Sequence, residues 1–401
     1  MGELPFPVFG MDLAAGGSGG GSGAPGVSGK PSTSDAHTKR FERDGWEVRE
    51  VAAADIPEQS NLADGVAFCI TDTREPLNDE IKATHPIAVY APADEDVEIA
   101  LGDHFAGGGG FIKTEDEAEG SELRGFAIDG RQGGKGAKLT FNRGGLVRDV
   151  SLHGEQDGVG DWPAGLYATL TGQHETLTLR NYNARGGASR TPGVASTHDS
   201  IGVLLDGRSN GLLRMEGCEI GSWPNNGLYA SGPRKHGNKG RAIVEDCLFF
   251  DSDRDGVRVG NDSVIRRTDI INDKQGEGKD NFRGFWLRYA RGVVIEDCRV
   301  KTFPGDDPGS AVRIDDNSGR VTIRDCDVEL RGSNDAARGI EAYSPNSSIG
   351  DSLLTVRDTR FHGNASPKQV VLVKEGRATD FDGVSIDEPL RSNAGSAIDI
   401  R

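Results

Sequence analysis

One short phrase recurs eight times between residues 145 and 361, and it restricts the possible folds of this chain more than any other feature. Each copy alternates apolar and polar residues around a polar pair in its middle. The copies read GLVRDVSL (145–152), LTLRNYNA (177–184), LRMEGCEI (213–220), AIVEDCLF (242–249), SVIRRTDI (263–270), VVIEDCRV (293–300), VTIRDCDV (321–328) and LTVRDTRF (354–361). Their sixth residues are separated by 32, 36, 29, 21, 30, 28 and 33 positions. A period of about thirty residues predicts a repeat architecture, in which each unit buries its apolar face only against its neighbours.

The pattern within the phrase predicts two short strands joined at a corner. In VTIRDCDV, Val321 and Ile323 share one face, as do Cys326 and Val328, which is the period of a strand. At the polar pair the alternation is interrupted, so that two consecutive side chains, such as Arg324 and Asp325, both point outward. The fifth residue of the copies is Asp149, Asn181, Gly217, Asp246, Arg267, Asp297, Asp325 and Asp358. Asp, Asn and Gly tolerate a left-handed backbone, so seven of the eight copies suit a sharp bend there.

A second strand phrase is interleaved with the first. It reads GLYA (165–168), GVLL (202–205), GLYA (227–230), GVRV (256–259), GFWL (284–287), AVRI (311–314) and GIEA (339–342). Three short strands per turn, polar turns and almost no helical periodicity predict an all-β fold. We expect a right-handed parallel β-helix of about eight to nine coils.

The sixth residues of the first phrase point into the predicted core and include four cysteines. These are Cys218, Cys247, Cys298 and Cys326. A free cysteine in a dry core behaves as a small hydrophobic residue. With Cys69 the chain holds five cysteines, and an odd number argues against a disulfide framework. We therefore interpret the ladder as core packing.

The chain divides into three predicted regions. Residues 1–44 form an extended arm rich in Gly and Ser, residues 45–135 an N-terminal β-rich cap, and residues 136–401 the β-helix. The cap is expected to contain strands at 66–70, 87–90 and 97–101. Near the start of the arm, the apolar residues Leu4, Phe6, Val8 and Phe9 suit a docking peptide, so we expect them to anchor the chain to a partner or particle.

Composition restricts the setting and the partners. The chain has 63 acidic and 46 basic residues, a net charge of −17, and far more arginine than lysine. This balance is typical of haloarchaeal proteins, whose surface charge keeps them soluble in molar salt, although an ordinary acidic surface is the alternative. Nucleic acid is not an expected partner, because phosphate binding needs a basic patch. A membrane is not expected either, since no apolar run approaches about 20 residues.

The segment WPNNGLYASG (223–232), the VxxEDCxV phrases and the DGxxGxVxDV-like coils carry a resemblance to a known superfamily. Over residues 125–400 the chain resembles right-handed β-helix repeat proteins of the pectate-lyase-like superfamily, in particular those of haloarchaea and their viruses. That fold hosts lyases, hydrolases, epimerases and inert viral spikes. The N-terminus lacks the features of a signal peptide, which suits a virion component released by lysis. The tailspike and virion-fibre branch therefore fits best, and it implies a homo-oligomer, with a trimer favoured.

Candidate catalytic residues are few. Polygalacturonase-like members of the superfamily use a DD pair together with NTD, GHG and RIK motifs. Asp306 and Asp307 supply a DD pair, but the other three motifs are absent and a turn is the simpler interpretation. His198 and Asp199 suit an acid–base pair, yet they lie in a polar loop. We assign no catalytic residue, and a polysaccharide lyase or hydrolase is the alternative function.

One segment imitates the opening of a calcium loop. Asp251, Asp253 and Asp255 alternate in DSDRDG (251–256), as the first ligands of an EF-hand do. An EF-hand loop joins two helices, whereas this segment lies between predicted strands. We therefore expect no cofactor or metal site, and only weak binding of any cation.

The third residue of the second phrase should point out of the coil and form a column. The column consists of Tyr167, Leu204, Tyr229, Arg258, Trp286, Arg313 and Glu341. Rings and guanidinium groups suit sugar faces, hydroxyls and carboxylates, and they are also enriched in subunit interfaces. Both interpretations stay open. Together these features favour a virion spike, fibre or turret of a halophilic archaeal tailed virus, exposed on the virion surface. Its expected partners are virion proteins, copies of itself and a host glycan or glycoprotein; a cell-surface adhesion module is a further alternative.

Overall fold

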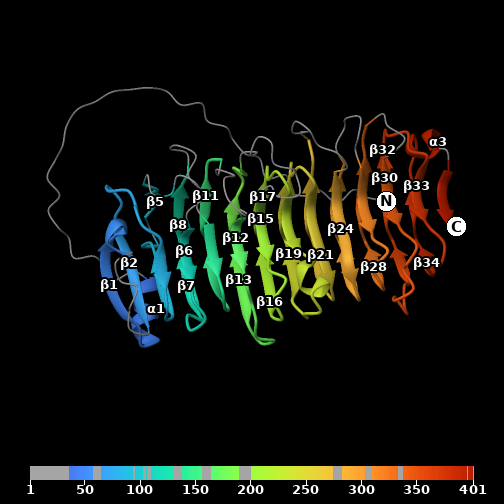
Figure 1. Cartoon of the computed structure of the whole chain (residues 1–401). Helices are drawn as coiled ribbons and strands as arrows, with labels where there is room; N and C mark the ends of the chain where they lie inside the picture. The colour runs from blue at the N-terminus through green and yellow to red at the C-terminus, as the bar shows by residue number, and fades with distance from the viewer. Residues whose placement is uncertain are drawn as a thin grey trace, which may run out of the picture. The chain divides into compact units, whose positions relative to one another are not determined.

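The computed structural model describes residues 36–56, 65–93, 95–102, 105, 110–130, 138–155, 164–188, 200–273, 282–302, 309–332, 337–394 and 396–400. Within these ranges the chain winds through three sheets in a repeating order, and Figure 1 shows the successive coils lying side by side. The sheets contain 13, 11 and 12 described strands, and neighbouring strands in them are parallel. The expected all-β parallel β-helix is therefore confirmed.

We name the three sheets I, II and III in the order in which a coil passes through them. Sheet I contains β1 (Glu47–Ala52), β2 (Val66–Asp72), β4 (Ile87–Tyr90), β7 (Ser121–Arg124), β10 (Gly145–Arg148), β13 (Thr176–Arg180), β16 (Leu212–Glu216), β19 (Arg241–Glu245), β22 (Val264–Arg266), β25 (Val293–Glu296), β28 (Val321–Arg324), β31 (Leu354–Arg357) and β34 (Thr379–Asp382). Sheet II contains β5 (Val97–Ala100), β8 (Phe126–Asp129), β11 (Ser151–His153), β14 (Asn183–Ala184), β17 (Glu219–Gly221), β20 (Leu248–Phe250), β23 (Asp269–Ile271), β26 (Arg299–Lys301), β29 (Asp327–Leu330), β32 (Arg360–Gly363) and β35 (Ser385–Ile386).

Sheet III contains β3 (Ile81–Ala83), β6 (Gly110–Thr114), β9 (Lys138–Phe141), β12 (Ala164–Ala168), β15 (Ile201–Leu205), β18 (Asn226–Ala230), β21 (Asp255–Asn261), β24 (Arg283–Ala290), β27 (Ser310–Ile314), β30 (Arg338–Ala342), β33 (Gln369–Val373) and β36 (Ser396–Ile400). The helical segments are short: α1 (Ala36–Arg43), the 3-10 turn η1 (Ala53–Asp55), α2 (Gly232–Lys235) and α3 (Leu390–Asn393). The first sequence phrase thus supplies sheets I and II, and the second phrase supplies sheet III. Within the described ranges, none of the helices approaches the length and hydropathy that crossing a bilayer requires.

The N-terminal region differs from the expected separate cap over 45–135. Its strands continue all three sheets, with β1, β2, β4 and β7 in sheet I, β5 and β8 in sheet II, and β3 and β6 in sheet III. Phe68, Val89 and Leu123 are fully buried in the same core cluster as Val147 of the first recognised repeat. The solenoid is therefore longer than eight or nine coils. The sequence period hides this extension because the first coils lack the repeated phrase.

The end of the predicted arm also differs from the expectation for 1–44. Residues 36–43 form helix α1, which covers the outer face of the first strands of sheet I. Phe41 is buried there, with its ring centroid 5.0 Å from that of Tyr90. Arg40 reaches the next coil and donates hydrogen bonds of 2.9 and 3.0 Å to Glu122. The anchor residues Leu4, Phe6, Val8 and Phe9 lie outside the described residues.

The corner between sheets I and II has the left-handed backbone that the fifth residue of the phrase predicts. All eight fifth residues have positive φ, from 43° at Asp358 to 62° at Gly217. Arg267, the exception in residue type, has φ of 45° and its guanidinium lies 2.7 Å from Asp246 of the preceding coil. The residue type at this position is therefore explained by backbone geometry.

The cysteine ladder lies in the core, as expected. Cys218, Cys247, Cys298 and Cys326 are at most 5% exposed, and all five cysteines of the chain are free thiols. Cys69 is buried separately, beneath α1. The glycine that opens most copies of the second phrase also has a packing role. At Gly284, a Cβ atom would lie 2.5 Å from the carbonyl oxygen of Ala311 and 2.7 Å from Val300, so there is no room for a side chain.

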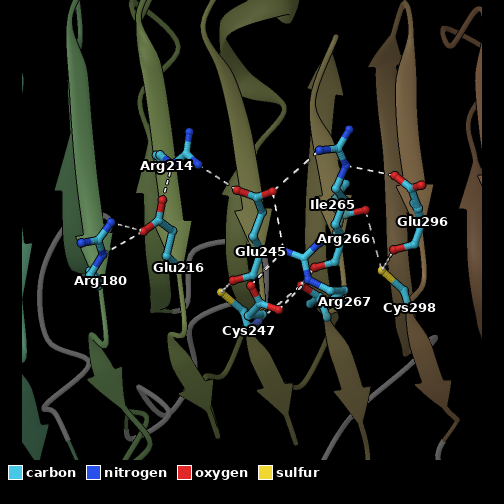
Figure 2. Close-up of polar contacts among 12 residues, drawn as sticks. Arg180, Arg214, Glu216, Glu245, Cys247, Ile265, Arg266, Arg267, Glu296 and Cys298 are labelled. Carbon is cyan, nitrogen blue, oxygen red and sulfur yellow. Dashed lines mark hydrogen bonds and ion pairs between the residues drawn. The ribbon is translucent and has the colours of Figure 1, made fainter.

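The outer face of sheet I carries an ion-pair ladder that crosses successive coils (Figure 2). Consecutive ion pairs link Arg180, Glu216, Arg214, Glu245, Arg266, Glu296 and Arg324. The nitrogen of Arg214 lies 2.9 Å from Glu245, and that of Arg324 lies 2.7 Å from Glu296. Opposite charges on neighbouring strands attract, so this ladder holds the coils together and its own arginines are paired.

Candidate functional site

The predicted column is continuous on the outer face of sheet III. The register pairs Tyr167 with Leu204, Leu204 with Tyr229, Tyr229 with Arg258, Arg258 with Trp286, Trp286 with Arg313, and Arg313 with Glu341. The residues on either side of Trp286, Phe285 and Leu287, belong to the solenoid core. Neighbouring strands thus place all seven side chains in one row outside that core. Whether the row binds a ligand or a second subunit stays a prediction.

The exposure of the column differs from the expectation. Leu204 is 7% exposed, and Arg258 and Trp286 are each 6% exposed. Arginine side chains from the same strand and from neighbouring coils lie over the indole ring of Trp286. The ring therefore offers no open face on which a sugar could stack. The side chains that remain half-buried are Tyr167, Tyr229, Arg313 and Glu341.

A pocket of about 430 Å³ lies over the N-terminal part of the column. Its lining consists of Lys138, Tyr167, Leu204, Leu205, Asp206, Gly207, Tyr229, Gly232, Lys235 and His236. Helix α2, between β18 and β19, contributes Gly232 and Lys235 to one wall. The apolar floor is a small cluster outside the main core, in which Tyr167 and Tyr229 pack against Leu204 and its neighbours.

Hydrogen bonds among neighbouring polar side chains orient Tyr167 and Asp206 in this pocket. The hydroxyl of Tyr167 donates a hydrogen bond to Asp206, and Arg208 donates to the same carboxylate at 2.7 Å. Although burial acts in the opposite direction, these hydrogen bonds lower the pKa of Asp206. Burial and the bond to Asp206 raise the pKa of Tyr167. Burial also lowers the pKa of Lys138, whose amino group lies 4.8 Å from the centroid of the Tyr167 ring.

This arrangement favours binding of a hydroxylated ligand. Two tyrosine rings flank an apolar floor, and a carboxylate, two amino groups and an imidazole also line the pocket. Such pockets combine flat apolar contact with a few polar groups that fix the orientation of the ligand.

Further along the column, five arginines surround Trp286. The central carbons of their guanidinium groups lie 4.1 Å (Arg258), 4.4 Å (Arg283), 4.9 Å (Arg288), 5.7 Å (Arg254) and 5.8 Å (Arg313) from the ring centroid. Arg258 is also 4.2 Å from the centroid of Tyr229, so it lies between two aromatic rings of neighbouring coils. Beyond Trp286, Arg313 and Lys374 both approach Tyr343, at 4.6 and 3.7 Å. We call the set of Trp286 and its five arginines the Trp286 cluster.

The charges of the Trp286 cluster are only partly balanced. Asp255 pairs with Arg283 at 3.3 Å, and Asp315 pairs with Arg288 at 2.8 Å and with Arg313 at 3.1 Å. Within the described part of the chain, no carboxylate forms an ion pair with Arg254 or Arg258. The guanidinium of Arg258 instead donates to the hydroxyl of Ser231 at 3.0 Å. The Trp286 cluster therefore contains five arginines and only two carboxylates that pair with them. In the ladder of sheet I, by contrast, each arginine has a carboxylate partner.

The other candidate residues contribute no site in the described ranges. His198, Asp199, Asp306 and Asp307 lie outside the described residues. Asp255 is buried and pairs with Arg283 and Asn226. Asp251 accepts a hydrogen bond from the backbone of Asp273 at 2.8 Å. No group of three or more His, Cys, Asp or Glu side chains in the described ranges is placed to hold a metal ion, so Asp251, Asp253 and Asp255 do not gather as a calcium loop would require.

Sequence reasoning missed most of the residues around the column. Asp206 and Arg288 lie two positions after Leu204 and Trp286, so they point to the same side of the sheet and strand periodicity could have found them. Lys138 belongs to β9, in a coil that lacks the repeated phrase. The contributions of α2 and Arg254 come from connections between strands, where the period carries no information.

A profile of the family described as the right handed beta helix region matches residues 169–386, more than half of the chain. The chain therefore belongs to this family of right-handed β-helix proteins. Among curated proteins, no sequence matches the chain.

Several solved structures resemble the chain at very low sequence identity. The surface protein and adhesin PfbA of Streptococcus pneumoniae has 10% identity and a TM-score of 0.50, over 84% of this chain and 90% of PfbA. The Dettilon tailspike protein has 10% identity and a TM-score of 0.45, over 88% of this chain and 68% of the tailspike. The periplasmic alginate epimerase AlgG has 9% identity and a TM-score of 0.43, over 85% of this chain and 83% of AlgG. At such identity the likeness to PfbA bears on the fold alone, and the function has to be argued from the residues.

Proposed function

We propose that this chain is a surface-exposed protein that binds a glycan on the outer face of sheet III, through the pocket between Tyr167 and Tyr229. The observation that carries the proposal is the pocket itself. It lies on a row of rings and cations in a chain of net charge −17 with only 6% aromatic residues. Concentrating scarce residue types on one face favours a binding role for that face.

The geometry of the pocket supports a sugar as its ligand. Tyr167 and Tyr229 are half-buried and line the pocket beside the floor formed by Leu204. Asp206 accepts hydrogen bonds and Lys138 and Lys235 donate them, which matches the hydroxyl groups of a pyranose. A pocket of about 430 Å³ is within the usual range for small ligands.

The setting that we propose is a spike, fibre or turret of a tailed virus that infects a halophilic archaeon. The excess of carboxylates and the small number of lysines support a halophilic setting, because surface charge keeps a protein soluble in molar salt. The apolar residues Leu4, Phe6, Val8 and Phe9 support an anchor that docks to other virion proteins, and a homotrimer is the favoured assembly. Deleting residues 1–35 should leave a folded, glycan-binding β-helix that no longer incorporates into particles. Normal incorporation of the truncated chain would contradict this setting.

Glycan binding is tested by removing the rings of the pocket. We expect the variant with Tyr167→Ala and Tyr229→Ala to lose about tenfold or more in affinity for surface oligosaccharides of the host, because ring contacts of about 1 kcal/mol each are lost. Isothermal titration calorimetry measures the change. The matched control is Phe250→Ala on sheet II, where Arg185 lies 5.7 Å from the ring as a similar pair outside the pocket. Equal affinity of the pocket variant and the control would contradict the proposal.

Incubating the chain with the same oligosaccharides and following their length over time distinguishes binding from cleavage. Release of shorter oligosaccharides by the wild-type chain, and not by the pocket variant, would favour the polysaccharide lyase or hydrolase alternative. Binding without release is the outcome that we expect.

A further inference from the structure

We infer that the Trp286 cluster is a binding site for an oxoanion, a carboxylate or sulfate group, held by Arg254, Arg258 and the indole Nε1 of Trp286. As a statement about the glycan, this inference rests on the proposed function, because it makes the ligand acidic. As a statement about the site, it stands on the residues of the cluster alone.

Arg258 lacks a counter-charge among the described residues. Arg258 is 6% exposed, and within the described ranges it forms no ion pair with a carboxylate. An arginine keeps its proton under all ordinary conditions, so it cannot escape this situation by becoming neutral. A buried ion without a counter-charge is costly, which favours uptake of an anion from outside the chain. Burial also lowers the pKa of Arg258, as expected for a cation with insufficient counter-charge.

A hydrogen-bond donor of the same cluster also lacks an acceptor. The indole Nε1 of Trp286 is buried and has no hydrogen-bond partner among the described residues. Buried donors are nearly always satisfied, and an exception in a native fold calls for a missing acceptor. An oxoanion has several acceptor oxygens, so it can satisfy Nε1 and the neighbouring guanidinium groups together.

Three carboxylates near the cluster already have partners. Asp255 and Asp315 bind Arg283, Arg288 and Arg313. Glu341 follows Arg313 in the column but accepts hydrogen bonds from Ser310 and Tyr343, each at 3.2 Å. The positive charge that remains is therefore centred on Arg258 and Arg254. It lies on the same face of sheet III as the pocket, toward the C-terminus, where an acidic unit of a longer glycan would reach it.

The test uses the full chain and free anions. Sodium sulfate and sodium glucuronate are titrated at constant ionic strength, with glucose as the neutral control, while thermal unfolding and tryptophan emission are recorded. We expect both anions to raise the unfolding temperature of the wild type along a saturating curve, and glucose to leave it unchanged. Arg258→Gln should weaken the apparent affinity about tenfold or more, because a charged hydrogen bond is lost. Anion binding beside the indole should change the tryptophan emission of the wild type, and Trp286→Phe should abolish that change.

Sulfate also stabilises proteins in general by exclusion from their surfaces, and this effect rises without saturation. The control for it is Arg324→Gln on sheet I, whose arginine is already paired with Glu296. This variant should keep the saturating response of the wild type. If Arg258→Gln does not fold, Arg254→Gln takes its place, because Arg254 is only half-buried. Identical anion responses of the wild type and the cluster variant would overturn the inference.

The outcomes separate this inference from the proposed function. Saturable binding of sulfate without any glycan binding would keep the anion site and reject the glycan-binding function. Glycan binding that is indifferent to Arg258→Gln and to acidic groups on the sugar would keep the function and reject the anion site.

Discussion

At the scale of single residues, two positions of the repeated phrase are determined by local geometry. The fifth residue adopts a left-handed backbone, and Asp, Asn or Gly occupies it in all copies except Arg267. The sixth residue points into the core, where Cys298 is 2% exposed and contacts the carbonyl oxygen of Glu296 at 3.2 Å. A hydrogen bond with Cys326, together with burial, raises the pKa of the Cys298 thiol. We therefore expect this thiol to stay protonated and unreactive in the folded chain.

The core position of Cys298 gives a direct prediction. Cys298→Asp should destabilise the fold by about 3–5 kcal/mol, because it buries a carboxylate that has no cationic partner. Chemical denaturation measures the loss. The matched control is Cys298→Thr, since Thr268 is fully buried at the same position of the preceding coil. Unfolding of Cys298→Asp at the same denaturant concentration as the wild type would show that the side chain is not in the core.

At the scale of elements, sheets I and III use arginine differently. On sheet I, Arg214, Arg266 and Arg324 alternate with glutamates, and each lies within 3.0 Å of a carboxylate. On sheet III, the Trp286 cluster places arginines against rings and leaves Arg258 without a carboxylate among the described residues. Sheet I therefore holds coils together by charge pairing, whereas sheet III keeps positive charge available.

The ladder of sheet I predicts a specific sensitivity to mutation. Glu245 ion-pairs with Arg214, Arg266 and Arg267, and its side chain is 14% exposed. Glu245→Gln should cost about 1–2 kcal/mol at low salt, because it removes the charge that three arginines share. The comparison is Glu47→Gln, whose side chain is 59% exposed and whose ion pair among the described residues is with Arg49. That change should have a much smaller effect on stability, because solvent screens an exposed pair. Equal losses for the two variants would show that the ladder is not a cooperative network.

At the scale of the whole molecule, the chain carries a net charge of −17. The paired charges of the ladder on sheet I attract one another, while the remaining carboxylates repel. Salt screens both interactions, since the Debye length falls from about 10 Å at 0.1 M to about 3 Å at 1 M. Because unpaired negative charge exceeds positive charge, repulsion should dominate.

We therefore expect the unfolding temperature to rise markedly when KCl is increased from low to molar concentration. Thermal unfolding followed by circular dichroism measures this rise. The deficit of Glu245→Gln should shrink over the same range, because screening weakens the ladder of the wild type. A salt-independent or falling unfolding temperature would remove the argument for a halophilic setting.

The sequence by itself determined the class of fold and the local geometry of each coil. Asp325 and Cys326 in one phrase already specify a bend followed by a core residue, and the spacing of Tyr229, Arg258 and Trp286 already specifies one row. This information is local because each coil contacts only its neighbours. Residues at equivalent positions of successive repeats therefore lie next to each other on neighbouring strands.

Only the tertiary structure decided how far the solenoid extends and what surrounds the row. The sequence predicts a cap for the first coils because Phe68 and Val89 are in no repeated phrase, although they share the core of the later coils. Trp286 was expected to be exposed, yet arginines from neighbouring strands and a connecting segment cover it. The pocket likewise joins Lys138 to His236, residues far apart in sequence. Such contacts depend on loops of variable length and on long side chains. The positions of both differ from coil to coil, so the sequence period does not predict them.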